Sequence, residues 1–470
     1  MEGTINIYQD TIVAPATTPG TGAISIVRLS GPECFKIADA VVKLRHGTIS
    51  EAAAYTIHYG EVKNLDDVLV SVFRAPHSYT GEDSVEISTH ASSYIVSELV
   101  RLLLDAGARF AQPGEFTRRA FLNGKMDLAQ AEAVADVISS TTAASHRVSM
   151  NQLKGGFSAE LSNLRTELLE MASLLELELD FSEEDVEFAD RSRLLALLDT
   201  AKAHVDKLAS SFRQGNMIKN GVPVAIVGAA NAGKSTLLNA LLGEERAIVS
   251  DIAGTTRDTI EETLVIDGIL YRFIDTAGIR ESSDTIEKIG IDRALSKLSQ
   301  AEIVLALLDP LEDVSSQVKV IAEKVDTSSQ KLFFLINKAD LLSKDDINKF
   351  VTMINTFVIS TENQQNIVII SAKSGKGIKE LEKALVESEK GLIPNADSTF
   401  VTNERHYEAL IKASAALTQC RNSLEGRIPA DLIAEDLRQA LRSINEILGT
   451  DLLDPETILH SIFKNHCIGK

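Results

Sequence analysis

The sequence predicts a multidomain protein with an α+β N-terminal domain and an all-α helical domain, into which an α/β domain is inserted. Short strand-like stretches fill the first 122 of its 470 residues, and long helical stripes follow. From residue 220 buried strands alternate with helices, and helices return near residue 400. Insertions are tolerated where chain ends lie close together, so the flanking helices are expected to form one domain. We therefore expect domains at 1–122, 123–219, 220–392 and 393–470, the second and fourth being the two parts of the helical domain.

The composition excludes several classes of protein. Hydrophobic residues make up 44% of the chain, enough for large cores, while 67 acidic against 47 basic residues give a net charge of −20. This charge argues against a general nucleic-acid or membrane coat. The three cysteines lie far apart without a C-x-x-C pair, so neither a disulfide framework nor a zinc site is expected. With no secretory signal and no apolar run of about 18 residues, a cytoplasmic protein without a membrane span is expected.

The N-terminal domain is expected to combine short strands with one helix. Stretches 11–14, 23–29, 68–73 and 84–88 are rich in β-branched residues or alternate in the manner of strands with one buried face. Residues 94–104 read as an amphipathic helix. No catalytic triad or metal cluster is visible in this part of the sequence.

Two apolar stripes with helical spacing predict a helical bundle core after Met126. The first stripe consists of Leu161, Leu164, Leu168, Met171 and Leu175. The second consists of Leu198, Ala201, Val205, Leu208 and Phe212. An acidic stretch, 180–187, separates them.

Five buried-strand runs predict a mostly parallel sheet with helices on both faces. They are 222–227, 270–274, 303–308, 332–336 and 366–370. Sequence motifs stand at the strand ends, where ligands bind to such sheets.

The first of these runs leads into Gly228-Ala-Ala-Asn-Ala-Gly-Lys-Ser235, which matches G-x-x-x-x-G-K-[ST]. The glycines let the backbone aim several N–H groups at one anion, and the following helix adds its positive N-terminus. Lys234 is expected to reach the β- and γ-phosphates and the Ser235 hydroxyl to ligate Mg²⁺. A chance glycine-rich turn is the alternative, but strand, loop and helix occur in the required order.

Four further motifs follow the phosphate loop. In Asp275-Thr-Ala-Gly278 the aspartate can hold Mg²⁺ through water, and in Gly254-Thr-Thr-Arg-Asp258 Thr256 can ligate it. In Asn337-Lys-Ala-Asp340 the aspartate can accept hydrogen bonds from N1–H and the exocyclic amine of guanine, a donor pair that adenine lacks. Ser371-Ala-Lys373 is expected to support the base.

Five such motifs in order predict a GTP-binding domain of the P-loop GTPase (Ras-like) type. The nucleotide-binding residues expected from them are Asn231, Ala232, Gly233, Lys234, Ser235, Thr236, Gly254, Thr256, Asp275, Thr276, Ala277, Gly278, Asn337, Lys338, Asp340, Ser371, Ala372 and Lys373.

Hydrolysis of GTP requires an oriented water. Ile279 follows the glycine of the Asp275 motif, so no glutamine stands there to position that water. Glu287 is one candidate, and a solvated helix acid is the reading that spacing alone favours.

The chain resembles the MnmE (TrmE) family of bacterial tRNA modification GTPases along nearly its full length. The matching stretches are Arg28-Leu-Ser-Gly31, Tyr79-Thr-Gly-Glu-Asp83, Pro113-Gly-Glu-Phe-Thr117, Ala120-Phe-Leu-Asn-Gly-Lys125, Asp127-Leu-Ala-Gln-Ala-Glu132, Asn231-Ala-Gly-Lys-Ser235, Gly254-Thr-Thr-Arg-Asp258 and Cys467-Ile-Gly-Lys470. The last is the most discriminating, because other GTPases share the middle motifs but not this ending.

The resemblance implies an enzyme that acts on tRNA together with an FAD-containing partner of the MnmG/GidA family. The pair would install a carboxymethylaminomethyl-type group at carbon 5 of the wobble uridine, with a one-carbon unit from 5-formyl- or methylene-tetrahydrofolate. The competing interpretation is a regulatory or ribosome-assembly GTPase switch without modification chemistry.

The resemblance also implies a homodimer in which two GTPase domains meet across GTP, with K⁺ where other systems insert an arginine finger. The matched cation positions are Asn231, Ser250, Ile252 and Thr255. Asp251 and Ala253 belong to the same nucleotide-wrapping loop. Glu287 matches the family acid that orients the water.

A folate site is carried over to Arg28, Glu86 and Lys125, with Lys470 nearby. A carboxylate can bind the amide–amine edge of a pterin, and cationic side chains suit folate carboxylates. Without the resemblance each of these residues reads as an ordinary surface charge. Cys467 is either a free thiol on a tail or a thiol presented beside the folate.

Overall fold

The computed structural model describes residues 10–180, 191–229, 231–246, 262–274, 298–358, 366–392, 399–426, 428, 430–450, 462 and 469. The chain divides into two compact units, one of residues 1–139, 149–207 and 408–470 and the other of residues 140–148 and 208–407. Each unit is described by itself. Within the described ranges, no helix combines the length and the apolar character needed to cross a membrane.

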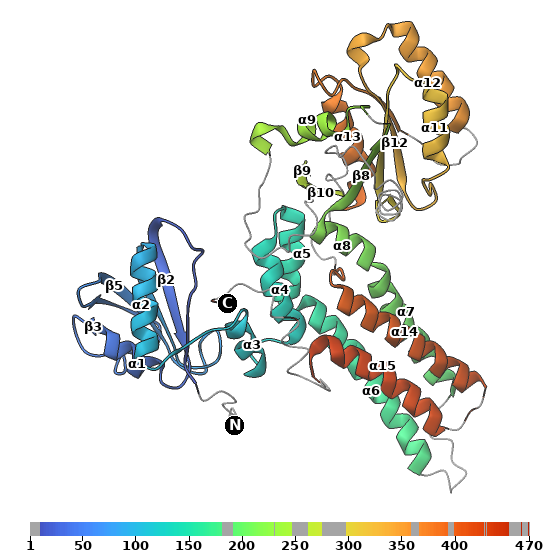
Figure 1. The fold of residues 1–470 in the computed structure, drawn as a ribbon. Helices are drawn as coiled ribbons and strands as arrows, with labels where there is room; N and C mark the ends of the chain where they lie inside the picture. The colour runs from blue at the N-terminus through green and yellow to red at the C-terminus, as the bar shows by residue number, and fades with distance from the viewer. Residues whose placement is uncertain are drawn as a thin grey trace, which may run out of the picture. The chain divides into compact units, whose positions relative to one another are not determined.

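The first unit begins with a seven-stranded sheet in the order β3-β4-β5-β6-β2-β1-β7 (Figure 1). All neighbours are antiparallel except β1 and β7. The strands are β1 Ile12–Pro15, β2 Gly22–Ser30, β3 Val42–Leu44, β4 Thr56–Val62, β5 Asp66–Phe73, β6 Ser84–Ala91 and β7 Arg109–Phe110. The four strands predicted for this domain are present.

Helices α1 (Cys34–Val41) and α2 (Ser93–Asp105) pack on one face of this sheet, where alternate strand residues such as Val68, Val70 and Val72 are buried. The expectation of a single helix was wrong. The described part of 1–122 contains α1, α2 and α3 (Glu115–Leu122). The two helices that were not predicted, α1 and α3, have eight residues each. That length is too short for an apolar stripe to repeat.

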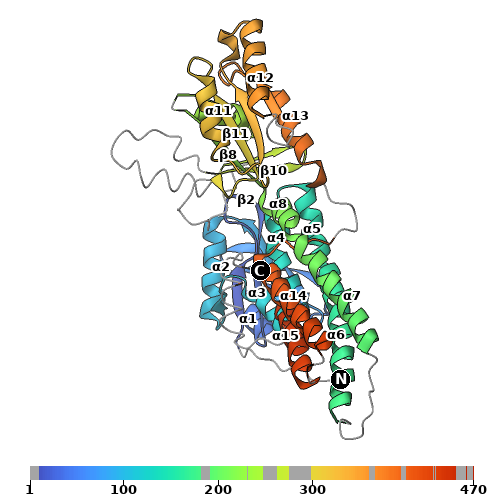
Figure 2. The same cartoon turned by 90° about the vertical axis from the view of Figure 1, so that its right-hand side faces the viewer.

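The helical segments before and after the second sheet contain longer helices. They are α4 Leu128–Ser139, α5 Ala143–Leu153, α6 Gly156–Asp180, α7 Arg191–Ser210, α14 Glu404–Glu425 and α15 Ala430–Leu448. The predicted stripe on α6 is buried throughout, from Leu161 to Leu175. Helix α15 packs along α6 (Figure 2). Its Leu437 and Ile444 are fully buried.

The second predicted stripe continues only to Leu208. Phe212 does not belong to it, because α7 ends at Ser210 and Phe212 opens a new helix, α8 (Phe212–Asn220). The N–H and the hydroxyl of Ser211 both donate to the carbonyl of Leu208, which tightens the chain into a turn between the helices. Phe212 instead stacks on Tyr407, with ring centroids 4.5 Å apart.

The second unit contains a six-stranded sheet in the order β13-β12-β11-β8-β10-β9. The strands are β8 Val222–Gly228, β9 Glu262–Ile266, β10 Ile269–Ile274, β11 Ile303–Leu308, β12 Lys331–Ile336 and β13 Asn366–Ile369. Every pair is parallel except β9 with β10. The five predicted buried strands and the mostly parallel sheet are confirmed.

Helices cover both faces of this sheet. Leu305 faces a core shared with α9 (Lys234–Arg246) and α13 (Ile378–Ser388), while Val304 and Ala306 face a core shared with α11 (Val314–Ala322) and α12 (Lys344–Val358). The two pairs of helices lie on opposite sides of the sheet (Figure 1). Strand β11 is therefore buried along its whole length. Short 3₁₀ turns η3 (Ala339–Leu341) and η4 (Lys390–Leu392) complete the unit.

Strand β9 was not predicted. It forms a hairpin with β10 through Asp267 and Gly268, both with positive φ. The Asp-Gly pair between two alternating stretches is a hairpin signal that sequence reasoning passed over.

Candidate functional site

The phosphate loop joins the end of β8 to the start of α9, at the carboxyl edge of the parallel sheet. Gly228 and Gly233 have positive φ, and a Cβ at either would collide with its neighbours. At Gly228 it would lie 2.4 Å from the carbonyl oxygen of Leu307, and at Gly233 2.5 Å from Nδ2 of Asn337. Both positions therefore require glycine, because the loop is drawn closely against the ends of β11 and β12.

Lys234 folds back across this loop. Its Nζ donates to the carbonyl oxygens of Gly228 at 2.9 Å and Ala229 at 2.8 Å. Burial of the ammonium lowers its pKa from the usual 10.5. Ser235 and Thr236 follow in the first turn of α9, and a helix N-terminus favours anions. The loop thus presents one cation and a helix end at the same edge of the sheet.

Asn337, directly after β12, joins three of the predicted motifs. Its Nδ2 donates to the carbonyl of Ala232 at 2.7 Å, and its Oδ1 accepts from the N–H of Ala372 at 2.9 Å. The side chain is buried. The phosphate loop, the Asn337–Asp340 stretch and the Ser371–Lys373 stretch therefore meet at one amide group.

Asp340 and Lys338 lie beside this junction. A hydrogen bond from the Ser371 hydroxyl lowers the pKa of Asp340, so its carboxylate stays ionised and able to accept hydrogen bonds. Lys338 has a left-handed backbone with φ 56°, and its Nζ lies 2.5 Å from Oδ2 of Asp309. Sequence reasoning missed Asp309; an acid directly after the buried strand β11 was the available signal.

Several predicted residues lie outside the described ranges. They are Ser250, Asp251, Ile252, Ala253, Gly254, Thr255, Thr256, Asp275, Thr276, Ala277, Gly278, Glu287, Cys467 and Lys470. Of the four predicted cation ligands, Asn231 is described; it stands in the phosphate loop with φ 63°.

Mg²⁺ and a polyphosphate fit the residues that are described. The two glycines leave the loop without a Cβ, which would intrude on the Leu307 carbonyl at Gly228 and on the Asn337 side chain at Gly233, and Lys234 supplies the positive charge. The Ser235 hydroxyl is the hard oxygen donor that Mg²⁺ prefers.

In the first unit, Arg28 on β2 and Glu86 on β6 face each other across the sheet. Nε and Nη2 of Arg28 both approach Oε1 of Glu86, at 2.9 Å and 2.7 Å. Nη1 of Arg28 donates to the carbonyl of Gly469 at 3.2 Å. The guanidinium carbon lies 5.5 Å from the ring centre of Tyr79 and 5.7 Å from that of Phe116.

Lys125 is held at a different point. Its Nζ donates to the carbonyl of Pro76 at 3.0 Å, and its stem lies where a Cβ of Gly81 would reach it at 3.3 Å. The Tyr79–Asp83 stretch therefore contacts Arg28 through Tyr79 and Lys125 through Gly81. Arg28 and Glu86 are paired directly, and Lys125 joins them through this stretch.

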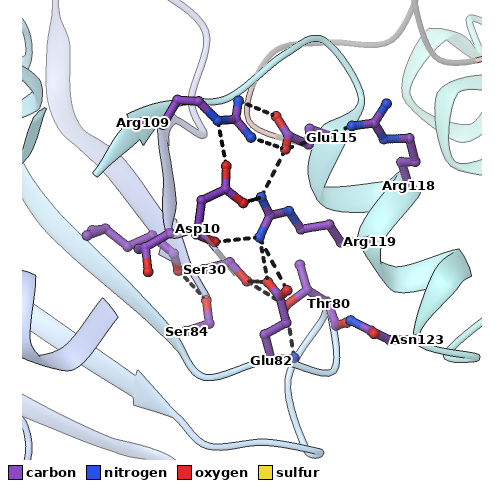
Figure 3. Close-up of polar contacts among 12 residues, drawn as sticks. Asp10, Ser30, Thr80, Glu82, Ser84, Arg109, Glu115, Arg118, Arg119 and Asn123 are labelled. Atoms are coloured by element: carbon purple, nitrogen blue, oxygen red, sulfur yellow. Dashed lines mark hydrogen bonds and ion pairs between the residues drawn. The ribbon is translucent and has the colours of Figure 1, made fainter. Parts of the chain in front are cut away.

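A buried ionic cluster supports the same stretch (Figure 3). Arg119 on α3 is fully buried and lies 3.3 Å from Glu82, 3.0 Å from Glu115 and 2.8 Å from Asp10. Arg109 adds a contact of 2.6 Å to Glu115. A buried guanidinium is tolerated only when it is paired in this way.

Hydroxyl and amide groups extend the cluster. The Ser30 hydroxyl donates to Glu82 at 2.7 Å and also contacts the Thr80 hydroxyl, while Asn123 donates to the carbonyl of Thr80 (Figure 3). Sequence reasoning quoted the stretches that contain Glu82 and Glu115 but assigned these acids no role, because only folding brings Arg119 between them.

The fold and the nucleotide site define the class of protein, a P-loop GTPase domain inserted into a larger chain. The family model described as "GTP-binding protein TrmE N-terminus" matches residues 11–125, and the one described as "MnmE helical domain" matches residues 128–467.

Curated relatives match this chain over nearly its full length. A "tRNA modification GTPase MnmE" of Bacteroides thetaiotaomicron is 49% identical over 470 residues, covering 98% of this chain and 100% of the relative. Proteins with the same name from Flavobacterium johnsoniae and Bacteroides fragilis are each 48% identical, covering 99% and 98% of this chain and 100% of either relative. The chain belongs to the MnmE (TrmE) family of tRNA modification GTPases.

Proposed function

We propose that this chain binds GTP with Mg²⁺ and hydrolyses it in the course of modifying tRNA. One observation carries the nucleotide part of the proposal. The buried amide of Asn337 connects the phosphate loop to both stretches that would read guanine. The relatives named as tRNA modification GTPases support the tRNA part.

The described residues have separate tasks in this proposal. Lys234 neutralises the β- and γ-phosphates, exchanging its bonds to Gly228 and Ala229 for phosphate oxygens. Asp340 accepts hydrogen bonds from the guanine edge, and a base without that donor pair leaves the carboxylate unpaired. The Ser235 hydroxyl, with Thr256, would hold Mg²⁺, which offsets charge on the phosphate oxygens. Glu287 is proposed to orient the attacking water.

A homodimer with K⁺ at each nucleotide is part of the same proposal. Asn231, Ser250, Ile252 and Thr255 would hold the cation, which offsets charge between the β- and γ-phosphates. In the first unit, Ile57, Tyr59 and Leu69 are about half exposed or more, and Tyr59 and Leu69 are cross-strand partners. Apolar side chains gathered on one sheet face support contact with a second copy.

The modification chemistry rests on the family. An FAD-containing partner of the MnmG/GidA family would act with this chain at carbon 5 of the wobble uridine, forming a carboxymethylaminomethyl-type group. A reduced folate, 5-formyl- or methylene-tetrahydrofolate, would supply the one-carbon unit. Arg28, Glu86, Lys125 and Lys470 would bind it. Arg28 occupies Oε1 of Glu86, so the N–H donors of the pterin edge would meet the remaining carboxylate oxygen. Cys467 is proposed to present its thiol beside the folate.

The proposed hydrolysis is tested by measuring GTP turnover of the full-length protein in KCl and in NaCl at equal ionic strength. Turnover is expected to be at least about tenfold faster in KCl, as one charge offset of ~1.4 kcal/mol would give. The Asn231→Ala variant should lose this difference. Asn348→Ala, on the exposed face of α12, is the control and should keep it. Equal rates in both salts would remove K⁺ from the proposal, and absence of any GTP turnover would remove the activity.

A further inference from the structure

Asp309 is a buried carboxylate at the carboxyl edge of the second sheet. It directly follows β11, is 3% exposed, and uses both oxygens. Oδ1 accepts the N–H of Leu311 at 3.0 Å, and Oδ2 lies 2.5 Å from Nζ of Lys338. The mechanism outlined above gives this residue no task.

The backbone of Asp309 is held as firmly as its side chain. Gln317, on α11, accepts the N–H of Asp309 at its Oε1 (3.0 Å) and donates from Nε2 to the Asp309 carbonyl (2.9 Å). One amide therefore satisfies both main-chain groups of Asp309. The backbone that carries the carboxylate is therefore held by contacts that do not involve Lys338.

Lys338 is constrained at both ends. Its backbone is left-handed, with φ 56° and ψ 32°, and its ammonium is anchored to Asp309. A free lysine side chain samples many rotamers, and ordering it costs conformational entropy. Anchoring removes that freedom at the position between Asn337, which touches the phosphate loop, and Asp340. The lysine side chain, about a quarter exposed, is thereby held in place at this edge.

The pair is not explained by stability alone. Desolvating two charges costs roughly what their attraction returns, so a buried ion pair is weak evidence of a stabilising role. A fixed lysine stem two residues before the guanine-reading Asp340 does have a use, because a planar base packs on an alkyl surface whose conformational entropy has already been lost.

We propose that Asp309 is a positioning residue of the nucleotide site. It holds Lys338 so that the lysine stem forms one wall of the base and ribose subsite, and Gln317 holds Asp309. The inference rests on the proposed binding of guanine nucleotides and adds to it a residue that acts through Lys338 rather than on the ligand.

A double-mutant cycle with GDP as the probe tests this inference in the full-length protein. Asp309→Asn keeps an oxygen for the N–H of Leu311 but turns an amide NH₂ towards Nζ of Lys338, and Lys338→Met keeps the stem but removes the charge. Each is expected to weaken GDP binding about tenfold, the effect of ~1.4 kcal/mol. The double variant should bind no more weakly than Lys338→Met alone. The KM for GTP should rise in Asp309→Asn while kcat changes less than about twofold.

Asp313→Asn is the matched control. This aspartate caps α11 from the same loop by accepting the N–H of Ser315. Asparagine caps helices about as well as aspartate, so the substitution removes only a nearby charge and should leave the melting temperature and the GDP affinity nearly unchanged. If Asp309→Asn does not fold, Gln317→Met is the second variant. It should weaken GDP binding, but by a smaller factor than Lys338→Met does.

Three outcomes would overturn the inference. They are unchanged affinity in Asp309→Asn, an equal loss from that substitution in the Lys338→Met background, and an equal loss in Asp313→Asn. If the unsubstituted protein binds no GDP, the proposed function itself fails. If the unsubstituted protein and the Asp309→Asn variant bind GDP equally well, only the role of Asp309 is removed.

Discussion

At the scale of single residues, charge burial decides how the first unit is held together. Arg119 is fully buried and meets Asp10, Glu82 and Glu115. Burial raises the pKa of Glu115, but hydrogen bonds from Arg109, the N–H of Gln112 and Arg119 outweigh it, and the net pKa is below the usual 4.5. Glu115 therefore favours the folded state at all pH values above 4.5, and this contribution is lost as pH falls through the lowered pKa.

Replacing Glu115 with glutamine should show this dependence. The Glu115→Gln variant leaves two guanidinium groups without their shared carboxylate and should lose about 3 kcal/mol of unfolding free energy at pH 7. The difference from the unsubstituted protein should shrink below pH 4.5. Urea denaturation followed by circular dichroism at several pH values measures both effects. Glu98→Gln, which breaks a surface pair with Arg101, should change stability little. A constant difference across the pH range would contradict the assignment.

At the scale of elements, the ends of parallel strands assemble the nucleotide site. Strand β8 delivers the phosphate loop, β11 delivers Asp309, and β12 delivers Asn337 to the same edge. The polar side chains between these ends are hydrogen-bonded to backbone groups of neighbouring elements, so each element orients the next. Loss of one connecting amide should therefore affect the ligand site more than the sheet.

The Asn337→Ala variant tests that connection. It leaves the carbonyl of Ala232 and the N–H of Ala372 without a side-chain partner, at a cost of about 1–3 kcal/mol for each buried group. We expect at least about tenfold weaker GTP binding, with the far-UV circular dichroism spectrum unchanged. Thr352→Ala, which removes an exposed hydroxyl bonded within α12, is the control. Undiminished affinity in Asn337→Ala would show that the loop orders itself independently of β12.

At the scale of the whole molecule, the residues of the two proposed sites belong to different units. The nucleotide residues belong to the second unit, whereas Arg28, Glu86 and Lys125 belong to the first. Each unit has its own sheet and its own core. If the proposed function holds, GTP turnover and folate-dependent chemistry are separable by substitution.

This separation can be tested in a strain that lacks the gene and is complemented with variants. Mass spectrometry of its wobble-uridine nucleosides measures the modification. Glu86→Gln should abolish the modified nucleoside while the purified variant still hydrolyses GTP. Asn337→Ala should lower both. Glu33→Gln, an exposed acid paired with Lys36, should restore modification fully. Full modification with Glu86→Gln would remove the folate site from Glu86, and an unmodified nucleoside profile in every complemented strain would favour a GTPase switch without modification chemistry.

Elements with a long apolar pattern were predicted correctly, and short elements were missed. The buried stripe on α6 and the five strands of the second sheet were predicted correctly, because apolar periodicity is a local property of many residues. The short helices α1 and α3 and the break at Ser211 were missed, since one or two turns carry too few residues for a period to show. Strand β9 was missed although its Asp-Gly turn was visible.

The sequence by itself determined the class of each domain, the phosphate loop and the motifs that identify the family, because these depend on residue type and spacing along the chain. Only the tertiary structure decided which charges meet. Arg119 lies 37 positions from Glu82 and 109 from Asp10, and Lys338 lies 29 positions from Asp309. No pattern in the chain specifies such pairs. A charge needs a partner when it is buried, and only the folded chain buries it.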